Sequence, residues 1–187
     1  MLFYERVKQN KAVLLQKWVD KYYAAYPLGS TGFVRTSTDR FKNPIGIITQ
    51  TSLNTLYDAA IGEDIELAGV HNALNELIKL RAIQEMPASR AVGPMAQLKT
   101  LFKEEVFDVL VKENKDSKVL QEIFEEFFMV AARIDGLLLV SLDLYAEDRE
   151  RVYNLRVEEI HRSQSQVVRW AKLREEKMST NHNNSEE

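Results

Sequence analysis

The chain has 187 residues, of which 45% are hydrophobic and 28% are charged, and it contains only seven glycines and four prolines. This apolar content is too high for a disordered chain, and so few glycines and prolines argue against collagen-like, linker-like and turn-rich all-β proteins. The net charge of -3 excludes a strongly basic protein that attracts nucleic acid or a membrane surface, so we expect neither partner. Cysteine is absent, which excludes thiol catalysis, iron–sulfur ligation and disulfide switching.

Apolar residues recur at helical spacing in the first segment of the chain. Trp18, Val19 and Tyr22 share one broad apolar face, and Pro27 is expected to end this helix. Residues 28–43 hold two glycines and a cluster of Ser and Thr, so they are predicted to form the one long irregular connection.

The middle of the chain carries the start and stop signals of further helices. Asn43 before Pro44 is typical of an N-cap followed by proline at the first helical position, and Gly62 is expected to end this helix. Asp64 is predicted to cap the next helix, and Pro87 is predicted to begin another. No segment shows strand-like alternation of polar and apolar residues, so the predicted fold class is all-α.

The last predicted helix is the longest. Residues 119–177 contain no proline and only one glycine, Gly136, so we expect either one very long helix or two helices with a bend. Further upstream, Gly93 and Pro94 fall inside a predicted helix, where proline removes a backbone hydrogen bond. This pair marks either a kink or a late helix start.

Three charged residues interrupt apolar helical segments. Arg133 and Asp135 lie near the centre of residues 127–145, where each charge would cost about 2.5–3.5 kcal/mol on membrane insertion, so we expect a buried helix of a soluble protein. Arg81 ends another apolar run. Because buried charges must be paired, we predict an ionic contact between Arg81 and Asp135. Together with His71, these residues are candidates for an internal polar site, which either senses a ligand or is a structural clamp.

The histidines and common motifs do not indicate a specific chemistry. His71 is the only histidine expected inside the compact part, either as a boundary residue with a hydrogen-bond partner or as a haem ligand. Glu158 and His161 have the helical spacing of a di-iron ligand pair, but no second pair exists, so no metal site is predicted. Phosphate-loop, nucleophile-elbow and zinc-helix motifs are all absent. We therefore expect a protein that is not an enzyme and has no cofactor; the alternative is a haem- or metal-binding globin-like protein.

After Ala146 the apolar positions narrow to a heptad seam, which alternates steps of four and three residues along Tyr153, Val157, Ile160, Gln164, Val167, Ala171 and Arg174. A single helix cannot bury so narrow a stripe on a globular core, so we predict a parallel coiled-coil homodimer whose register Gln164 helps to fix. The alternative is a solvated helix that rests partly on its own domain. The predicted domains are a helical sensor-like domain (1–146), a signalling and dimerisation helix (147–178) and a disordered tail (179–187).

Several short motifs, taken together, resemble one protein family. They are Trp18 with Tyr26-Pro27, Arg40-Phe41-x-Asn43-Pro44-Ile45-Gly46, Arg81-Ala82-Ile83-Gln84, Pro87-x-Ser89-x-Ala91, Arg133-Ile134-Asp135, Leu142-Asp143-x-Tyr145, and Arg149-Glu150 with Tyr153 and Arg156-x-x-Glu159. Over residues 5–165 the chain resembles the N-terminal domain of the RsbRD-type RsbT co-antagonists, which are bacterial stress-signalling regulators.

The resemblance implies a dimeric, non-haem, globin-like helical bundle with a long C-terminal helix. In the related RsbR proteins that helix carries a signal into a STAS domain of the stressosome. The chain ends soon after the helix, so we expect either a standalone sensor without a STAS output domain or a truncated piece of a longer protein, and the start at Met1 and the polar tail favour the standalone sensor. The N-terminus has no apolar core of a signal peptide, which favours a cytoplasmic location. The expected function is thus a cytoplasmic regulatory domain whose partner is a STAS-domain protein or a kinase.

Overall fold

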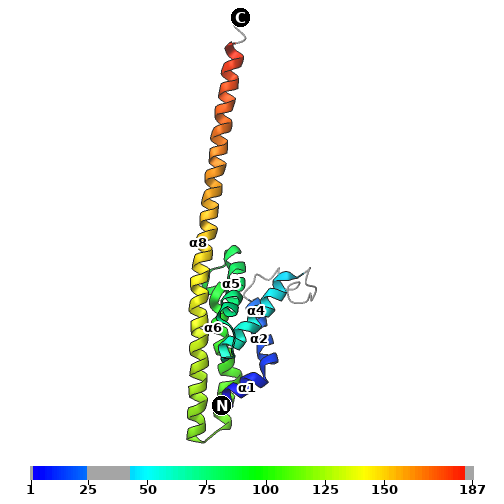
Figure 1. Ribbon diagram of the computed structural model, residues 1–187, viewed down its shortest axis with the longest axis vertical. Coiled ribbons are helices and arrows are strands. Elements are labelled where there is room, and N and C mark those ends of the chain that lie inside the picture. The colour runs from blue at the N-terminus through cyan, green and yellow to red at the C-terminus, as the bar shows by residue number, and fades with distance from the viewer. Residues whose placement is uncertain (1, 25–42, 184–187) are drawn as a thin grey trace. The chain divides into compact units, whose positions relative to one another are not determined.

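The computed structural model describes residues 2–24 and 43–183, and every regular element within them is a helix (Figure 1). The helices are α1 (Leu2–Gln9), α2 (Lys11–Ala24), α4 (Pro44–Ile61), α5 (Leu67–Ile83), α6 (Ala88–Phe102), η1 (Lys103–Phe107), α7 (Asp108–Glu113) and α8 (Ser117–Asn183). The predicted all-α class with a long C-terminal helix is therefore confirmed. Apart from Asn43, the predicted connection at 28–43 lies outside the described residues, and so do the motif residues Tyr26, Pro27, Arg40 and Phe41.

The chain divides into two compact units, Met1–Asp148 and Arg149–Glu187. Helix α8 contributes its first half to unit 1 and forms the described part of unit 2. Of the two alternatives for this segment, the structure has one helix of 67 residues, and Gly136 does not interrupt it. The helix runs to Asn183, past residue 179, where the tail was predicted to begin.

Local sequence signals explain both ends of α4. The Asn43 side chain accepts the backbone N–H of Gly46 at 2.9 Å, which confirms the predicted N-cap. Gly62 has a φ of 83°, a left-handed conformation that ends α4 as predicted. The prediction that Asp64 caps α5 is wrong, because the helix starts later, after Glu66, and no side chain caps it.

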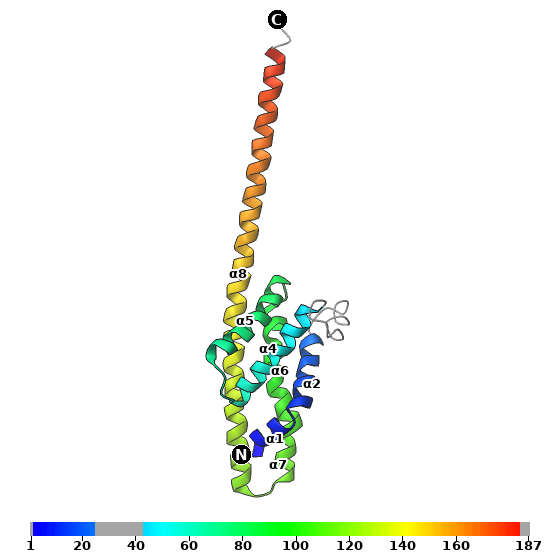
Figure 2. The same ribbon diagram turned by 45° about the vertical axis from the view of Figure 1, so that its right-hand side comes forward.

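The core of unit 1 is built mainly from large apolar and aromatic side chains. In both views, the helices from α1 to α7 gather beside the first half of α8 (Figures 1 and 2). Their inward faces bury a set of fully enclosed side chains that includes Phe3, Trp18, Tyr22, Tyr57 and Phe102. Ring edges meet ring faces within this set, as between Tyr57 and Phe102, whose centroids are 5.3 Å apart. Aromatic packing thus connects α1 and α4 to α6.

Tyr57 makes the stability of this core sensitive to alkaline pH. Its buried hydroxyl donates to the carbonyl oxygen of Val7 at 3.0 Å, and burial, followed by the negative charge of Asp58, raises the pKa of Tyr57. The unfolded state therefore loses this proton first, so we expect the free energy of unfolding to fall by about 1.4 kcal/mol per pH unit above about pH 10. Urea unfolding of the wild type and of Tyr57→Phe measures the effect. The stability advantage of the wild type should shrink between about pH 8 and pH 11; an advantage independent of pH would contradict the assignment.

Candidate functional site

The residues predicted to form one internal polar site do not come together. Arg81 is fully buried, whereas Arg133 and Asp135 are half-exposed and His71 is exposed. The predicted Arg81–Asp135 contact is wrong, because Asp135 forms an ion pair with Lys99 of α6 at 2.5 Å. His71 was expected inside the compact part, but its side chain is exposed. Successive side chains of a helix are turned by about 100°, which directs His71 towards solvent when Val70 before it is half-buried.

Arg81 lies at the junction of three helices, where it binds backbone carbonyl groups. Its Nη1 donates to the carbonyl oxygens of Arg90 at 2.6 Å and Ala91 at 3.0 Å, and its Nη2 donates to that of Tyr22 at 2.9 Å. The guanidinium also stacks on the Tyr22 ring, 3.7 Å from the ring centroid. Arg81 thereby fastens α5 to the C-terminal end of α2 and to the first turns of α6.

Pro94 explains why α6 offers a carbonyl to Arg81. Pro94 lies inside α6, so of the two alternatives, a kink or a late helix start, it does not mark a late start. Proline has no N–H, which leaves the carbonyl of Arg90, four residues earlier, without its usual helical donor. Arg81 supplies that donor, and Trp18 donates its indole N–H to the carbonyl of Pro94 at 2.7 Å. Among the alternatives left open by the sequence, these contacts favour the structural clamp for Arg81.

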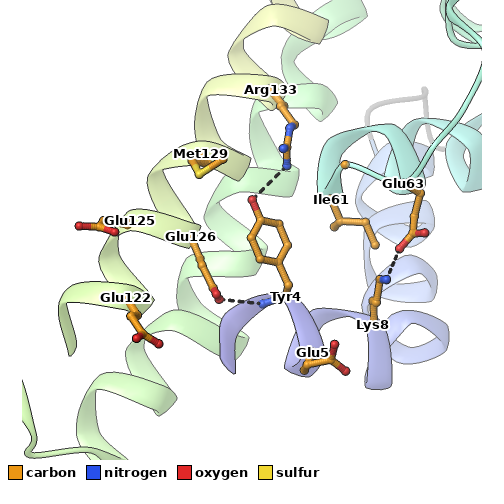
Figure 3. A pocket seen from close by; sticks show the side chains of 11 residues that line it. Tyr4, Glu5, Lys8, Ile61, Glu63, Glu122, Glu125, Glu126, Met129 and Arg133 are labelled. Atoms are coloured by element: carbon orange, nitrogen blue, oxygen red, sulfur yellow. Dashed lines mark hydrogen bonds and ion pairs between the residues drawn. The ribbon is translucent and has the colours of Figure 1, made fainter. Parts of the chain in front are cut away.

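A second polar cluster surrounds Arg133 in an open cavity of about 590 Å³ (Figure 3). Its walls come from α1, from the end of α4 and from the first half of α8, all within unit 1. Arg133 was a predicted site residue, but this cavity was not predicted, because its walls are distant in the chain.

Arg133 reaches across the cavity towards Tyr4 of α1. Its Nη1 donates to the Tyr4 hydroxyl at 3.1 Å, and its guanidinium carbon lies 5.8 Å from the centroid of the Tyr4 ring (Figure 3). The guanidinium also packs against Gly62, where an added Cβ would come within 2.6 Å of Nη1. Glycine at position 62 is thus favoured by its positive φ, whereas an added Cβ would displace only the flexible end of the Arg133 side chain.

Carboxylates line much of the remaining wall of the cavity. Glu126 is buried, and it accepts the backbone N–H groups of Phe3 at 2.8 Å and Tyr4 at 3.2 Å, where the positive end of the α1 dipole favours an anion. Glu63 pairs with Lys8 at 2.5 Å, and this hydrogen bond, with the charge of Glu63, raises the pKa of Lys8. The cavity therefore lies where α1 is fastened to both α4 and α8.

Helix α8 leaves apolar side chains exposed in both of its halves. In unit 2, Tyr153, Ile160 and Val167 of the predicted seam are 66%, 56% and 65% exposed. Gln164 and Arg174 are also exposed, Val157 is half-buried, and the side chain of Ala171 lies outside the described residues. Within the described part of the chain, most of these seam side chains are therefore left uncovered.

The exposed apolar face in unit 1 was not expected. The stretch 127–145 was predicted to be buried, yet Phe128, Leu139 and Leu142 are 62%, 63% and 43% exposed. The bundle covers only one face of α8, so the other face keeps its apolar side chains at the surface. The signal was present in the sequence, because these residues belong to a series with steps of three and four.

The described residues contain neither a metal-binding cluster nor a membrane-spanning helix. No group of three or more His, Cys, Asp or Glu side chains in this part of the chain could hold a metal ion. Glu158 and His161 are both exposed on α8. Among the described helices, none combines the length and the apolar character needed to cross a bilayer.

One of three comparisons with known proteins gave a match. Residues 12–160 match the family described as the RsbT co-antagonist protein rsbRD N-terminal domain. The search of curated proteins and the search of solved structures found no match. The matched range includes most of unit 1 and the first part of the predicted seam.

Proposed function

The chain belongs to the RsbRD N-terminal domain family, and we propose that it is a sensory or regulatory module of bacterial stress signalling that acts without catalysis. In this proposal a ligand or protein partner binds the helical body in unit 1, and α8 carries the effect to its C-terminal half. The module works in the cytoplasm as a homodimer, without haem, and its output partner is a STAS-domain protein or a kinase of a stressosome.

The observation that carries the proposal is the apolar stripe of α8. Two seam residues at heptad core positions, Ile160 and Val167, are more than half exposed in the single chain. Val168 and Trp170, which flank the seam, are 55% and 74% exposed. Exposed apolar side chains at heptad spacing are typical of a helix that pairs with another helix. A second copy of the chain would offer the same stripe.

The apolar face in unit 1 supports a longer pairing surface. In the sequence, the steps of three and four continue from Phe128 through Ala132, Asp135, Leu139, Leu142, Ala146 and Arg149 to Tyr153. Between Tyr153 and Val157 a step of four stands where the heptad pattern has a step of three. Such an irregular step locally unwinds a coiled coil but keeps the same face of the helix in contact with its partner. We therefore propose that the two copies pair in parallel along both halves of α8.

The mechanism follows from the continuity of α8. The helix contributes Glu126 and Arg133 to the contacts with α1 and also carries the seam. Binding to the body that favours one placement of α1 would therefore favour one arrangement of the paired helices. A small difference between two packed arrangements is enough for a regulatory switch.

Disulfide trapping tests the proposal directly, because the chain has no cysteine of its own. Gln164→Cys places a thiol in the seam, whereas Arg162→Cys places one at the opposite heptad position. In a parallel dimer, mild oxidation should join the seam cysteines quickly and leave Arg162→Cys largely monomeric. Equal rates, or no covalent dimer from Gln164→Cys, would contradict parallel pairing.

A second arm of this experiment tests transmission through α8. Glu126→Ala removes the carboxylate that caps α1, far along the chain from the seam. If the body controls the paired helices, this change should alter the disulfide rate of Gln164→Cys at least severalfold. Glu104→Ala, a change at an exposed residue of η1, is the matched control and should leave the rate unchanged. An unaltered rate in both variants would argue for a passive helix.

A further inference from the structure

We propose that the cavity beside Arg133 is completed by the second copy of the chain, whose Phe124 packs against Met129 and covers the open side of the cavity. This inference deepens the proposed function, on which it rests, because it makes the candidate site a site shared by the two paired copies. It is carried by the heptad register of α8 and by the burial of the two flanks of its exposed stripe.

The cavity lies on one flank of the exposed apolar stripe that α8 carries in unit 1. Phe128 belongs to this stripe and occupies the core position d of the heptad, so Met129 occupies the flanking position e. Met129 stands one turn before Arg133, lines the cavity and is 55% exposed (Figure 3). Met129 thus lies between the pairing face of α8 and the cavity.

The other flank of the stripe is covered by the bundle of the same chain. Ala131 and Tyr145 occupy the flanking position g, and both are buried. Phe124 has the same heptad position, and its ring meets the ring of Phe107 edge to face, with centroids 4.9 Å apart. Phe124 is nevertheless 41% exposed, so part of its ring is open to a further contact.

A parallel pair of helices brings these two flanks together. In a two-stranded parallel coiled coil, a residue at position g of one helix faces the residue at position e five places later on the other helix. Phe124 and Met129 are five places apart, so the Phe124 of each copy lies beside the Met129 of the other. An aromatic ring and a thioether sulfur attract each other, so this contact covers two apolar side chains that the single chain leaves exposed.

This contact connects the body of one copy to the cavity of the other. Phe124 packs on Phe107 of η1 in its own copy, and Met129 lines the cavity that contains Arg133. A molecule in the cavity would therefore lie against both copies. Filling the cavity would act on the pairing of the two α8 helices directly, and not only through the placement of α1.

A charge exchange at the two positions tests the inference through the dissociation constant of the dimer. Phe124→Lys and Met129→Glu each remove an apolar contact, so each should weaken the dimer. Combined in one chain, they create two Lys–Glu pairs across the parallel dimer. Analytical ultracentrifugation should then give a dissociation constant about threefold to tenfold lower than the two single effects together predict.

The design separates the second copy from contacts within one chain. Residues five places apart do not share a face of a helix, so the exchanged charges cannot pair within one α8. Any contact between Met129→Glu and Arg133 of the same chain also exists in the single variant, so it cancels. Phe124→Lys combined with Met129→Lys places like charges together and should show no recovery. Independent effects of the two exchanged charges would overturn the placement of Phe124.

Thiol reactivity tests whether the open side of the cavity is covered. Met129→Cys provides the only thiol of the chain, and it should react with a maleimide severalfold more slowly in the dimer than in the monomer obtained by dilution. Gln16→Cys is the matched control, because Gln16 is exposed on α2, which lies away from α8 in both views (Figures 1 and 2). Its thiol should react at the same rate in the dimer and in the monomer.

Disulfide trapping at Gln164→Cys distinguishes failure of this inference from failure of the proposed function, because it reports the pairing of the seam alone. Intact trapping with independent effects in the charge exchange, or with an unprotected Met129→Cys, would remove this inference alone. Loss of trapping would remove the parallel pairing on which it rests.

Discussion

Replacing Arg81 with methionine is expected to lower the free energy of unfolding by about 3–5 kcal/mol. Methionine fills much of the same volume, so the loss comes mainly from the three backbone carbonyls that Arg81 now binds. The carbonyls of Ala91 and Tyr22 are buried and that of Arg90 is partly buried, so an unpaired acceptor is costly there. Urea unfolding followed by circular dichroism measures the change. Arg90→Met is the matched control, because the Arg90 side chain is exposed and its loss should cost less than about 0.5 kcal/mol.

A double-mutant cycle with Pro94 tests the reason for this loss. Pro94→Ala restores a backbone N–H that can donate to the carbonyl of Arg90, the same acceptor that Arg81 binds. Pro94→Ala should therefore be more favourable in the Arg81→Met background than in the wild type, by about 1 kcal/mol. Strict additivity of the two changes would show that Arg81 does not compensate for the proline.

The helix ends that could be predicted from the sequence depend on neighbouring residues alone. Asn43 caps α4 because its side chain reaches an N–H three residues later, and Gly62 ends the helix because it adopts a positive φ. Arg81 was correctly expected to be buried, but its partners were not found, because they are carbonyls of α2 and α6. The carbonyl in α2 can accept a hydrogen bond because it lies near the end of that helix, and a carbonyl in α6 can do so because Pro94 has no N–H. The order of residues in the sequence does not show that these two places lie next to Arg81.

Tertiary packing also explains the errors around α8. Periodicity predicted that residues 127–145 form an apolar helix, but it does not distinguish a face covered by its own chain from a face left for a partner. Asp135 was assigned to Arg81 on charge alone, whereas Lys99 of α6 lies within reach. The cavity was missed for the same reason, since Tyr4, Gly62 and Arg133 become neighbours only when α1, α4 and α8 pack together.

Replacing Ile160 with glutamate is expected to weaken homodimer formation by at least about 100-fold, or roughly 2.7 kcal/mol. Ile160 occupies a core position of the seam, and a parallel dimer would bring two glutamates together between the helices, where both charges lose water. Because the side chain is 56% exposed in the single chain, the substitution should leave the fold of unit 1 intact. Analytical ultracentrifugation over a range of concentrations measures the dissociation constant.

Leu155→Glu is a stringent control for this prediction. Leu155 is 60% exposed, close to the value of Ile160, and it receives the same charge on the same helix. It lies five residues earlier, at the heptad position farthest from the seam. The two substitutions therefore differ mainly in the side of the helix on which the new charge lies. If general loss of surface hydrophobicity caused dissociation, both variants would become monomeric together. If the seam is the interface, Leu155→Glu should have nearly the wild-type dissociation constant, whereas the dissociation constant of Ile160→Glu should be much higher. A dimer that survives Ile160→Glu would place the pairing surface elsewhere and would remove the seam from the proposed signalling path.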